Sequence, residues 1–436
     1  MSEASDFLNA TAAERGADCE VWENAHETDE LVCRDGAVER RVATAATATA
    51  LTVWKDGTEG YAVHIPGGAD ASLVDTALAV GRALGSAPPA PAHRTPPPAE
   101  PGPGPLADPR LDETVAQRLA KLTAGPGDVD VELRARADRS RVLLHRAGGE
   151  PLRHTTGTFQ LQARITAKGR RVGFIAHQMF GRSADAVLAA AEGTELAELT
   201  ALARVLTRDP VPHLSHDDVL LDGRVMVKLF MLAVPAFQLD SVLEGRSPLA
   251  GRTGERIGSA GLSLVDDPLA ADSPLPTPWD DEGTACRATT LLEDGVLRGF
   301  LSSRRTAAEA GTVSTGSGRR GASGEMPTVQ PGFLALRPGT PLGDAPRDGR
   351  TLLKVVQANG AHTSNVITGD FSIGANAVLV TPDGAQHNAG NITLAGNVFE
   401  LLTRIDGHDG RPRVNRGHTS FVTSPGVWTS GLTIGR

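Results

Sequence analysis

The class of fold is decided by residues 19–65, CEVWENAHETDELVCRDGAVERRVATAATATALTVWKDGTEGYAVHI. Alternating or β-branched runs predict strands over residues 19–23, 30–34, 37–42, 47–54 and 60–65. Asp35-Gly36 and Asp56-Gly57 lie between these runs, and Asp-Gly is a strong signal for a tight hairpin turn. The stretch therefore predicts strands that follow one another in an antiparallel sheet.

Helices are predicted on both sides of this stretch. Ser5 can cap a helix that reaches Arg15, and Asp70 can cap a second helix that ends before Gly85. Further along, a helix over residues 111–122 precedes strand-like runs, and Ser183 begins an Ala/Leu-rich helical region that ends near Leu206. The strand-like runs cover residues 129–134, 140–145, 156–166 and 171–177.

Two proline-rich segments divide the chain. Ser86–Pro109 holds ten of the 29 prolines and predicts an extended linker or surface loop, since proline fits neither a helix interior nor a central strand. Asp209-Pro210-Val211-Pro212 is the second boundary. A chain of 436 residues is also too long for one core. We therefore expect an N-terminal domain over 1–208, with the proline-rich loop at 86–110, and a C-terminal domain over 209–436.

The C-terminal half is rich in turns and strands. Asp294-Gly295 and Pro382-Asp383-Gly384 each predict a hairpin, and Asn397 can cap a late helix. A helical stretch is predicted over Arg224–Pro235. Strands and helices do not alternate as in a doubly wound sheet, so the predicted class is α+β. The N-terminal domain is expected to hold a mixed antiparallel sheet with helices, and the C-terminal domain to be β-rich.

Composition limits the classes of function. The net charge of −9 and an aromatic content of 4% argue against a general nucleic-acid binder, which needs basic surfaces and stacking side chains. Three scattered cysteines cannot form a disulfide framework. No apolar run approaches the roughly 20 residues of a membrane span, and no signal-peptide pattern is present. These features predict a cytoplasmic protein.

Metal-binding patterns are weak. His213 and His216, followed by Asp217, form the only close histidine pair, and the spacing could place two imidazoles and a carboxylate around one metal ion. The alternative is an exposed interdomain loop, because two prolines precede the pair. The late histidines are too widely spaced to require a common site; they are His362, His387, His408 and His418.

Other candidate chemistry lies between residues 266 and 324. Gly311–Gly324, with Arg319 and Arg320, could form an anion or peptide-terminus site lined by backbone N–H groups; a flexible loop with two solvated arginines is the alternative. The run Asp280-Asp281-Glu282, like Asp266-Asp267, could bind a cation or accept backbone hydrogen bonds in a turn. Carboxylates near Cys286 disfavour a nucleophilic thiolate.

Six short motifs in order carry a family resemblance. They are LSLVDDP (262–268), WDDEG (279–283), LLEDGVL (291–297), TGSGRR (315–320), NVITGDFS (365–372) and ITLAGN (392–397). Together they resemble the TldD/PmbA family, long labelled modulators of DNA gyrase. The family has TldD-type subunits, which resemble zinc metallopeptidases with an HExxxH helix, and TldE/PmbA-type subunits, which lack that motif and pair with a TldD-type chain.

The resemblance places the family's HExxxH at Lys228–Ala233, where this chain has neither His nor Glu. No cysteine follows Cys286, so the third metal ligand of the family is absent too. Gln330 and Ala375-Asn376-Ala377 also depart from the family's pattern. The resemblance therefore implies a TldE/PmbA-like subunit with no catalytic residue and no metal of its own, and zinc is expected in a TldD-type partner.

The leading interpretation is a non-catalytic subunit that completes a peptidase cleft with its partner, for proteolysis or for maturation of a peptide or amide product. The residues expected to contact substrate or partner are Asp281, Glu282, Arg319, Arg320 and Asp370; structural turns are the alternative for each. Two other functions stay open. One is a stand-alone metallohydrolase that uses His213, His216 and Asp217. The other is a nucleic-acid-associated modulator.

Overall fold

The computed structural model describes residues 3–65, 70–85, 110–125, 127–360, 364–417 and 420–436. The proline-rich segment predicted at 86–110 therefore lies almost wholly outside the described residues. No helix in the described ranges is long and apolar enough to cross a membrane.

The N-terminal part is built on one long antiparallel sheet of six strands in the order β3-β2-β1-β4-β5-β6. The strands are β1 (Asp18–Arg34), β2 (Ala37–Lys55), β3 (Thr58–His64), β4 (Val129–Arg146), β5 (Leu152–Lys168) and β6 (Val172–Gly181). Both predicted Asp-Gly hairpins are present: Asp35 and Asp56, with the glycine after each, have positive φ angles. This is the backbone conformation that a two-residue turn requires.

The strands are longer than predicted. The runs at 19–23 and 30–34 are two ends of the single strand β1, and those at 129–134 and 140–145 belong to the single strand β4. The polar residues between the runs were wrongly taken as breaks. They continue the strand because β1 pairs with both β2 and β4 along this stretch, so the backbone hydrogen bonds are satisfied whatever the side chains are.

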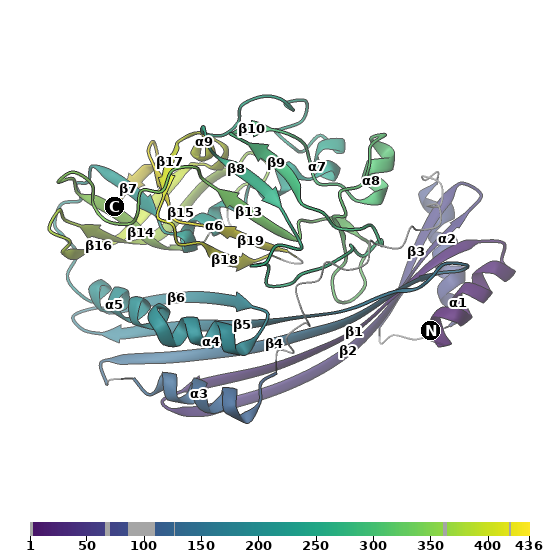
Figure 1. The fold of residues 1–436 in the computed structure, drawn as a ribbon, viewed down its shortest axis with the longest axis horizontal. Coiled ribbons are helices and arrows are strands. Elements are labelled where there is room, and N and C mark those ends of the chain that lie inside the picture. The colour runs from purple at the N-terminus through teal and green to yellow at the C-terminus, as the bar shows by residue number, and fades with distance from the viewer. Residues whose placement is uncertain (1–2, 66–69, 86–109, 126, 361–363, 418–419) are drawn as a thin grey trace.

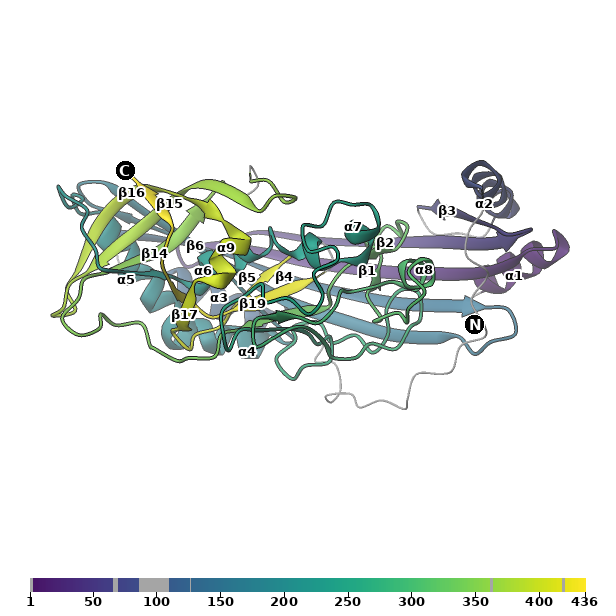
Figure 2. The same cartoon turned by 90° about the horizontal axis from the view of Figure 1, so that it is seen from above.

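Helices cover this sheet at both ends (Figures 1 and 2). They are α1 (Glu3–Glu14), α2 (Ala71–Leu84), α3 (Glu113–Thr123), α4 (Ala184–Ala190), a π-helical turn (Ala191–Glu195) and α5 (Leu196–Leu206). The caps predicted for α2 and α4 are present: the side chains of Asp70 and Ser183 accept hydrogen bonds from backbone N–H groups. Helix α2 approaches β3 so closely that a Cβ atom on Gly60 would lie 1.8 Å from the carbonyl oxygen of Ala77.

The C-terminal part contains two larger sheets and a small one. A seven-stranded sheet has the order β17-β20-β7-β14-β15-β16-β21, and a six-stranded sheet has the order β10-β9-β8-β13-β19-β18. The first sheet comprises β7 (Asp218–Leu221), β14 (Leu352–Asn359), β15 (Asp370–Val380), β16 (Gln386–Asn397), β17 (Ile405–His408), β20 (Val427–Thr429) and β21 (Thr433–Gly435). The second comprises β8 (Ser263–Asp266), β9 (Thr289–Glu293), β10 (Val296–Leu297), β13 (Phe333–Arg337), β18 (Arg413–Arg416) and β19 (Phe421–Ser424), and the small sheet pairs β11 (Gly318–Arg319) with β12 (Thr328–Val329).

Short helices connect these strands. They are α6 (Gly223–Phe230), a 3-10 turn (Val234–Phe237), α7 (Leu239–Leu243), α8 (Arg304–Glu309) and α9 (Val398–Thr403). The helix predicted over Arg224–Pro235 is shorter than expected: α6 ends at Phe230, and Pro235 lies in the first turn of the 3-10 segment. Proline lacks the N–H that a continuing helix would need.

The largest core lies between the two C-terminal sheets and includes the apolar face of α6. A second core lies under α3, α4 and α5 and also contains Leu220, Val356 and Trp428 from the seven-stranded sheet. The two parts of the chain therefore share buried apolar surface. The protein is α+β, with a long antiparallel sheet in its N-terminal part and a β-rich C-terminal part, as the sequence predicted.

Candidate functional site

Two polar sites lie where the long sheet meets the C-terminal part. The first, the acidic turn, is formed by Asp280–Glu282 and the arginines around it. The second, the α6 cavity, lies beside the helix that the resemblance aligns with the family's HExxxH. Other hollows of the described surface lie over the long sheet, such as one of about 630 Å³ lined by Glu23, Arg141 and Arg153.

In the acidic turn, Asp280 is fully buried and accepts three hydrogen bonds from backbone N–H groups. Its donors are Glu282 and Thr284 (3.1 and 2.8 Å to Oδ1) and Gly318 (2.9 Å to Oδ2). A Cβ atom on Gly318 would lie 2.4 Å from Glu282 Oε2, so any other residue at 318 would force the Glu282 side chain to move. The carboxylate of Asp280 therefore accepts backbone hydrogen bonds in a turn. The sequence left this role open as the alternative to cation binding.

Asp281 joins this turn to the long sheet. Its Oδ1 accepts a hydrogen bond from Trp22 Nε1 in β1 at 3.0 Å, and its Oδ2 accepts one from the backbone N–H of Arg320 at 2.8 Å. The guanidinium of Arg320 lies over the rings of Trp22 and Tyr61, 5.8 and 5.3 Å from their centroids. This arrangement holds the segment around residue 320 against β1 and β3.

Glu282 and Arg304 make a second connection. The backbone N–H of Arg304 donates to Glu282 Oε2 at 2.6 Å, and the guanidinium donates to the Glu282 carbonyl at 2.8 Å and to Glu20 of β1 at 3.4 Å. Burial, followed by the neighbouring charge of Asp280, raises the pKa of Glu282 to about 7. Sequence reasoning missed Arg304, because nothing in its local pattern shows that it meets Glu20, 284 residues away.

Arg319 is buried as well. Its Nη2 donates to the sulfur of Cys286 at 3.4 Å. Burial raises the pKa of the Cys286 thiol to about 12, which agrees with the expectation that this cysteine is not a nucleophile. The alternative of a flexible loop with two solvated arginines is wrong for residues 319 and 320, since each is 6% exposed.

The structure brings together four of the five residues expected to contact substrate or partner. Asp281, Glu282, Arg319 and Arg320 lie in or beside the acidic turn. Asp281 binds Arg320 and the long sheet, Glu282 binds Arg304, and Arg319 binds Cys286. Asp370 does not belong to this group: it is exposed at the start of β15 and accepts hydrogen bonds from Thr368 and Asn397.

The histidines are dispersed. Within the described ranges, no three His, Cys, Asp or Glu side chains form a group that could hold a metal ion, and this includes His213, His216 and Asp217. Asp217 instead accepts a hydrogen bond from the backbone N–H of Thr351 at 2.8 Å. Of the late histidines, His362 and His418 lie outside the described residues, and His408 accepts a hydrogen bond from the backbone N–H of Gly410.

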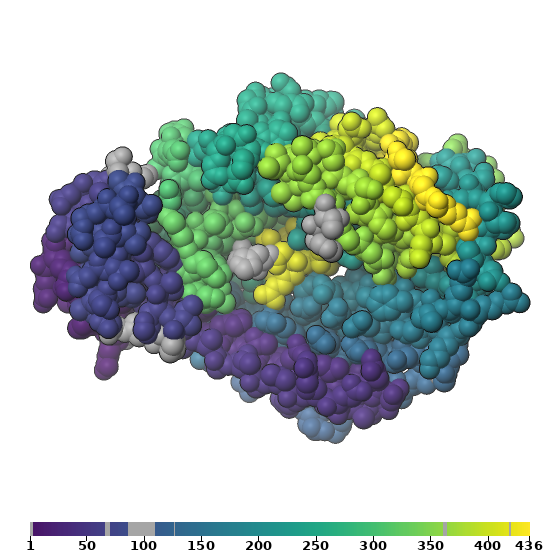
Figure 3. Space-filling model, turned by 180° about the vertical axis from the view of Figure 1, so that it is seen from behind, coloured from purple at the N-terminus to yellow at the C-terminus, as the bar shows by residue number. Residues whose placement is uncertain are grey.

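The α6 cavity has a volume of about 160 Å³ and lies between α6, β14, β18 and the free edge of β6. Its polar lining includes Arg224 and Lys228 of α6, His177 and Gln178 of β6, Gln357 of β14 and Asn415 of β18. Figure 3 shows the surface hollowed along this junction, between the C-terminal strands and the long sheet.

The two cations of α6 have different surroundings. Asp222 caps the helix and binds Arg224 through two hydrogen bonds of 2.8 Å. Burial would raise the pKa of Asp222, but the charge of Arg224 outweighs burial and lowers the pKa to about 2. Lys228 donates to the Ala358 carbonyl at 3.2 Å, and burial lowers the pKa of its ammonium group.

The positions aligned with HExxxH do not fit a zinc ion. Lys228 presents an ammonium group, and Leu229 and Ala233 are fully buried aliphatic side chains of the C-terminal core. Zinc requires nitrogen, sulfur or carboxylate ligands with free lone pairs. His177 lines the same cavity, and burial lowers its pKa well below the usual value, so it is neutral at pH 7.

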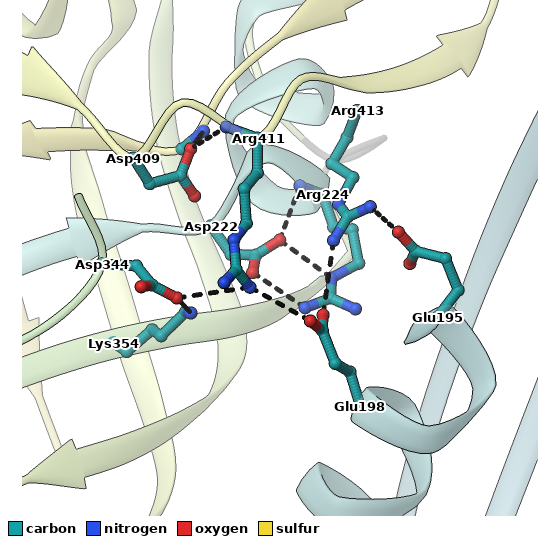
Figure 4. A network of polar contacts seen from close by, with 10 residues as sticks. Glu195, Glu198, Asp222, Arg224, Asp344, Lys354, Asp409, Arg411 and Arg413 are labelled. Carbon is teal, nitrogen blue, oxygen red and sulfur yellow. Dashed lines mark hydrogen bonds and ion pairs between the residues drawn. The ribbon is translucent and has the colours of Figure 1, made fainter. Parts of the chain in front are cut away.

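Ion pairs hold the cavity's surroundings together (Figure 4). Arg413 of β18 binds Glu195 and Glu198 at the start of α5, and Arg411 binds Glu198 and Asp344. We call these five residues the α5–β18 network. They connect the π-helical turn and the start of α5 to β18 and to the loops that contain Asp344 and Arg411.

Comparison with known proteins places the chain in a family. Residues 215–436, just over half of the chain, match the family model described as the PmbA/TldA metallopeptidase C-terminal domain. The chain therefore belongs to the PmbA/TldD metallopeptidase family, as the motifs indicated.

Individual relatives agree. A metalloprotease of Methanothermobacter thermautotrophicus is 31% identical over 207 residues, which are 47% of this chain and 45% of that protein. The metalloprotease PmbA of Escherichia coli is 28% identical over 187 residues, 43% of this chain and 39% of that protein. The matched part of the chain thus spans less than half the length of these relatives.

Two crystal structures share the whole fold. A putative modulator of a DNA gyrase from Thermotoga maritima has a TM-score of 0.81 and 20% identity, with 99% of each chain covered. TldE from Thermococcus kodakarensis has a TM-score of 0.79 and 20% identity, with 99% of this chain and all of that chain covered. At this identity the likeness shows the fold alone.

Proposed function

We propose that this chain is a non-catalytic, TldE-like subunit of a metallopeptidase, which pairs with a zinc-bearing TldD-type chain and shapes the site where a peptide or amide substrate is held. The observation that carries the proposal is the chemistry of α6. The helix aligned with the family's metal-binding motif has a lysine, a leucine and an alanine at the ligand and base positions, and two of these side chains are packed in the core.

The likeness of the fold to TldE supports the same proposal, and so do the metalloprotease names of the relatives. The acidic turn then has a supporting role. It fixes the segment around Arg320 to the long sheet through Asp281 and Trp22, so that the surface offered to a partner is rigid. In this proposal, the TldD-type partner carries out the hydrolysis.

The first test is elemental analysis of the purified chain for zinc. We expect less than about 0.1 zinc per chain, because the α6 positions lack ligands. Near one zinc per chain, lost in His213→Ala, would overturn the proposal and favour a stand-alone metallohydrolase.

The second test measures the pairing. The chain and a TldD-type chain from the same source, produced together, should elute as one complex, and only the mixture should cleave an unfolded protein substrate. Cleavage by this chain alone, with the same products, would contradict the proposal.

A further inference from the structure

The α6 cavity contains a cation that no acidic side chain neutralises. Arg224 is paired with Asp222, but in the described part of the chain no carboxylate lies within ion-pair distance of Lys228 Nζ, which contacts only the Ala358 carbonyl. Burying an ammonium group without a counter-charge is costly. Lys228 is therefore a cation of this cavity without an ion-pair partner among the described residues.

Hydrogen-bond donors around the cavity are also incompletely used. Nη1 of Arg224, a side chain only 6% exposed, has no hydrogen-bond partner in the described structure. The amide of Asn415 donates to the sulfur of Met231, which is a weak acceptor. Lys228 uses one of its three N–H donors on Ala358. Arg224 and Lys228 of α6 and Asn415 of β18 all line the cavity, and each has N–H donors that the described structure does not fully use.

The size of the cavity limits the ligand. A volume of about 160 Å³ would hold about five water molecules at about 30 Å³ each. A small planar group therefore fits in the cavity, with the donors of the lining side chains around it. The single positive charge of the unpaired Lys228 ammonium group would be neutralised by a ligand with a charge of −1. A phosphate ester, with a charge of about −1.5 to −2, would leave excess negative charge.

We propose that the α6 cavity binds a carboxylate group, held by Lys228 and Arg224. Two sources share this chemistry: a small free carboxylic acid and the C-terminal carboxylate of a peptide. The peptide source rests on the proposed function, because a subunit of a peptidase meets peptide termini. The carboxylate site itself rests only on the geometry of α6 and its neighbours.

Titration calorimetry on the full chain at pH 7 and low salt tests the site. The probes are N-acetyl-L-alanine, acetyl-pentaalanine with a free C-terminal carboxylate, and the same peptide with a C-terminal amide. We expect a carboxylate probe to bind and the amide to bind at least tenfold more weakly. Lys228→Met should weaken carboxylate binding at least tenfold, and Lys228→Arg should largely keep it.

The matched control is Lys121→Met, which removes a lysine charge at an exposed position of α3 and should leave binding unchanged. Equal affinity for both carboxylate probes would identify the ligand as a small free acid. Tighter binding of the peptide would identify it as a peptide C-terminus. Either result supports the carboxylate site. Absence of carboxylate binding, equal affinity for the amide, or wild-type affinity in Lys228→Met would overturn it. Because the chain is measured alone, these results do not depend on finding a TldD-type partner.

Discussion

At the scale of single residues, the buried carboxyl group of Asp266 in β8 is expected to make the stability of the fold depend on pH. Its Oδ1 accepts hydrogen bonds from the backbone N–H groups of Gly332 and Phe333, at 3.0 and 2.9 Å. Burial, partly offset by the charge of Arg319, raises its pKa to about 6. The unfolded chain should have the ordinary value of about 4. Between these two values the folded state holds a proton that the unfolded state has released.

We therefore predict that Asp266 lowers the free energy of unfolding as pH rises from about 4 to about 6, by on the order of 3 kcal/mol. Below this window the group is neutral in both states, and above it the group is charged in both. Asp266→Asn keeps an oxygen for both N–H donors but does not titrate. Denaturant unfolding at a series of pH values should show that the variant loses this decrease. An unchanged pH profile would show that burial does not shift the pKa as stated.

At this scale, the sequence indicated which residues form a polar cluster, but not which other residues they contact. Asp281, Glu282, Arg319 and Arg320 were selected from short motifs, and the structure brings all four together. The contact of Asp281 with Trp22, and that of the neighbouring Arg304 with Glu20, could not be predicted, because each joins positions more than 250 residues apart in the chain. Asp370, selected by the same motifs, has only local partners.

At the scale of elements, α9 shows how one polar residue can begin a helix. Asn397 Oδ1 accepts hydrogen bonds from the backbone N–H groups of Phe399 and Glu400, and its Nδ2 donates to the Thr368 carbonyl and to Asp370. The same side chain therefore caps α9 and holds the turn before β15.

We predict that Asn397→Ala lowers the free energy of unfolding by about 1–2 kcal/mol, since the loss of a capping side chain costs about that much. Thermal or denaturant unfolding would measure the change. Asn391→Ala, an exposed position in β16, is the control and should change stability by less than about 0.5 kcal/mol. Equal effects of the two variants would contradict the capping role.

Turns and caps were the elements that the sequence predicted best. Asp-Gly pairs, Asn397, Asp70 and Ser183 act within a few residues, so their signal is local. Strand length was predicted less well, because β1 and β4 continue through polar stretches wherever neighbouring strands supply hydrogen bonds. The end of α6 at Phe230 was also missed, although Pro235 indicated that the helix could not continue far.

At the scale of the whole molecule, the α5–β18 network should contribute to the docking of α5 against β18. Arg413 and Glu195 are nearly buried, with side chains 12% and 14% exposed, whereas Arg411 and Glu198 are more open, at 48% and 36%. Removal of one partner from a buried pair leaves an uncompensated charge, while an exposed pair contributes little.

We predict that Arg413→Met lowers the free energy of unfolding by about 3 kcal/mol, because Glu195 stays buried without its partner. Arg411→Met, the matched control, should cost less than about 1 kcal/mol. Adding Glu195→Gln to Arg413→Met should restore part of the loss. Denaturant unfolding of the four proteins would measure these differences, and equal losses in the two single variants would contradict the predicted importance of burial.

The sequence by itself determined the α+β class, the hairpins, the helix caps at Asp70, Ser183 and Asn397, and the family, because these depend on short patterns and on motifs in a fixed order. The predicted cap at Ser5 was wrong, since this residue lies inside α1. It also showed which residues occupy the positions that align with the family's HExxxH motif. Only the tertiary structure decided that Arg319 and Arg320 are buried, that Glu20 and Trp22 meet the acidic turn, and that Lys228 faces a cavity without an acidic partner. Burial and pairing depend on which distant strands come together, and no local pattern records that choice.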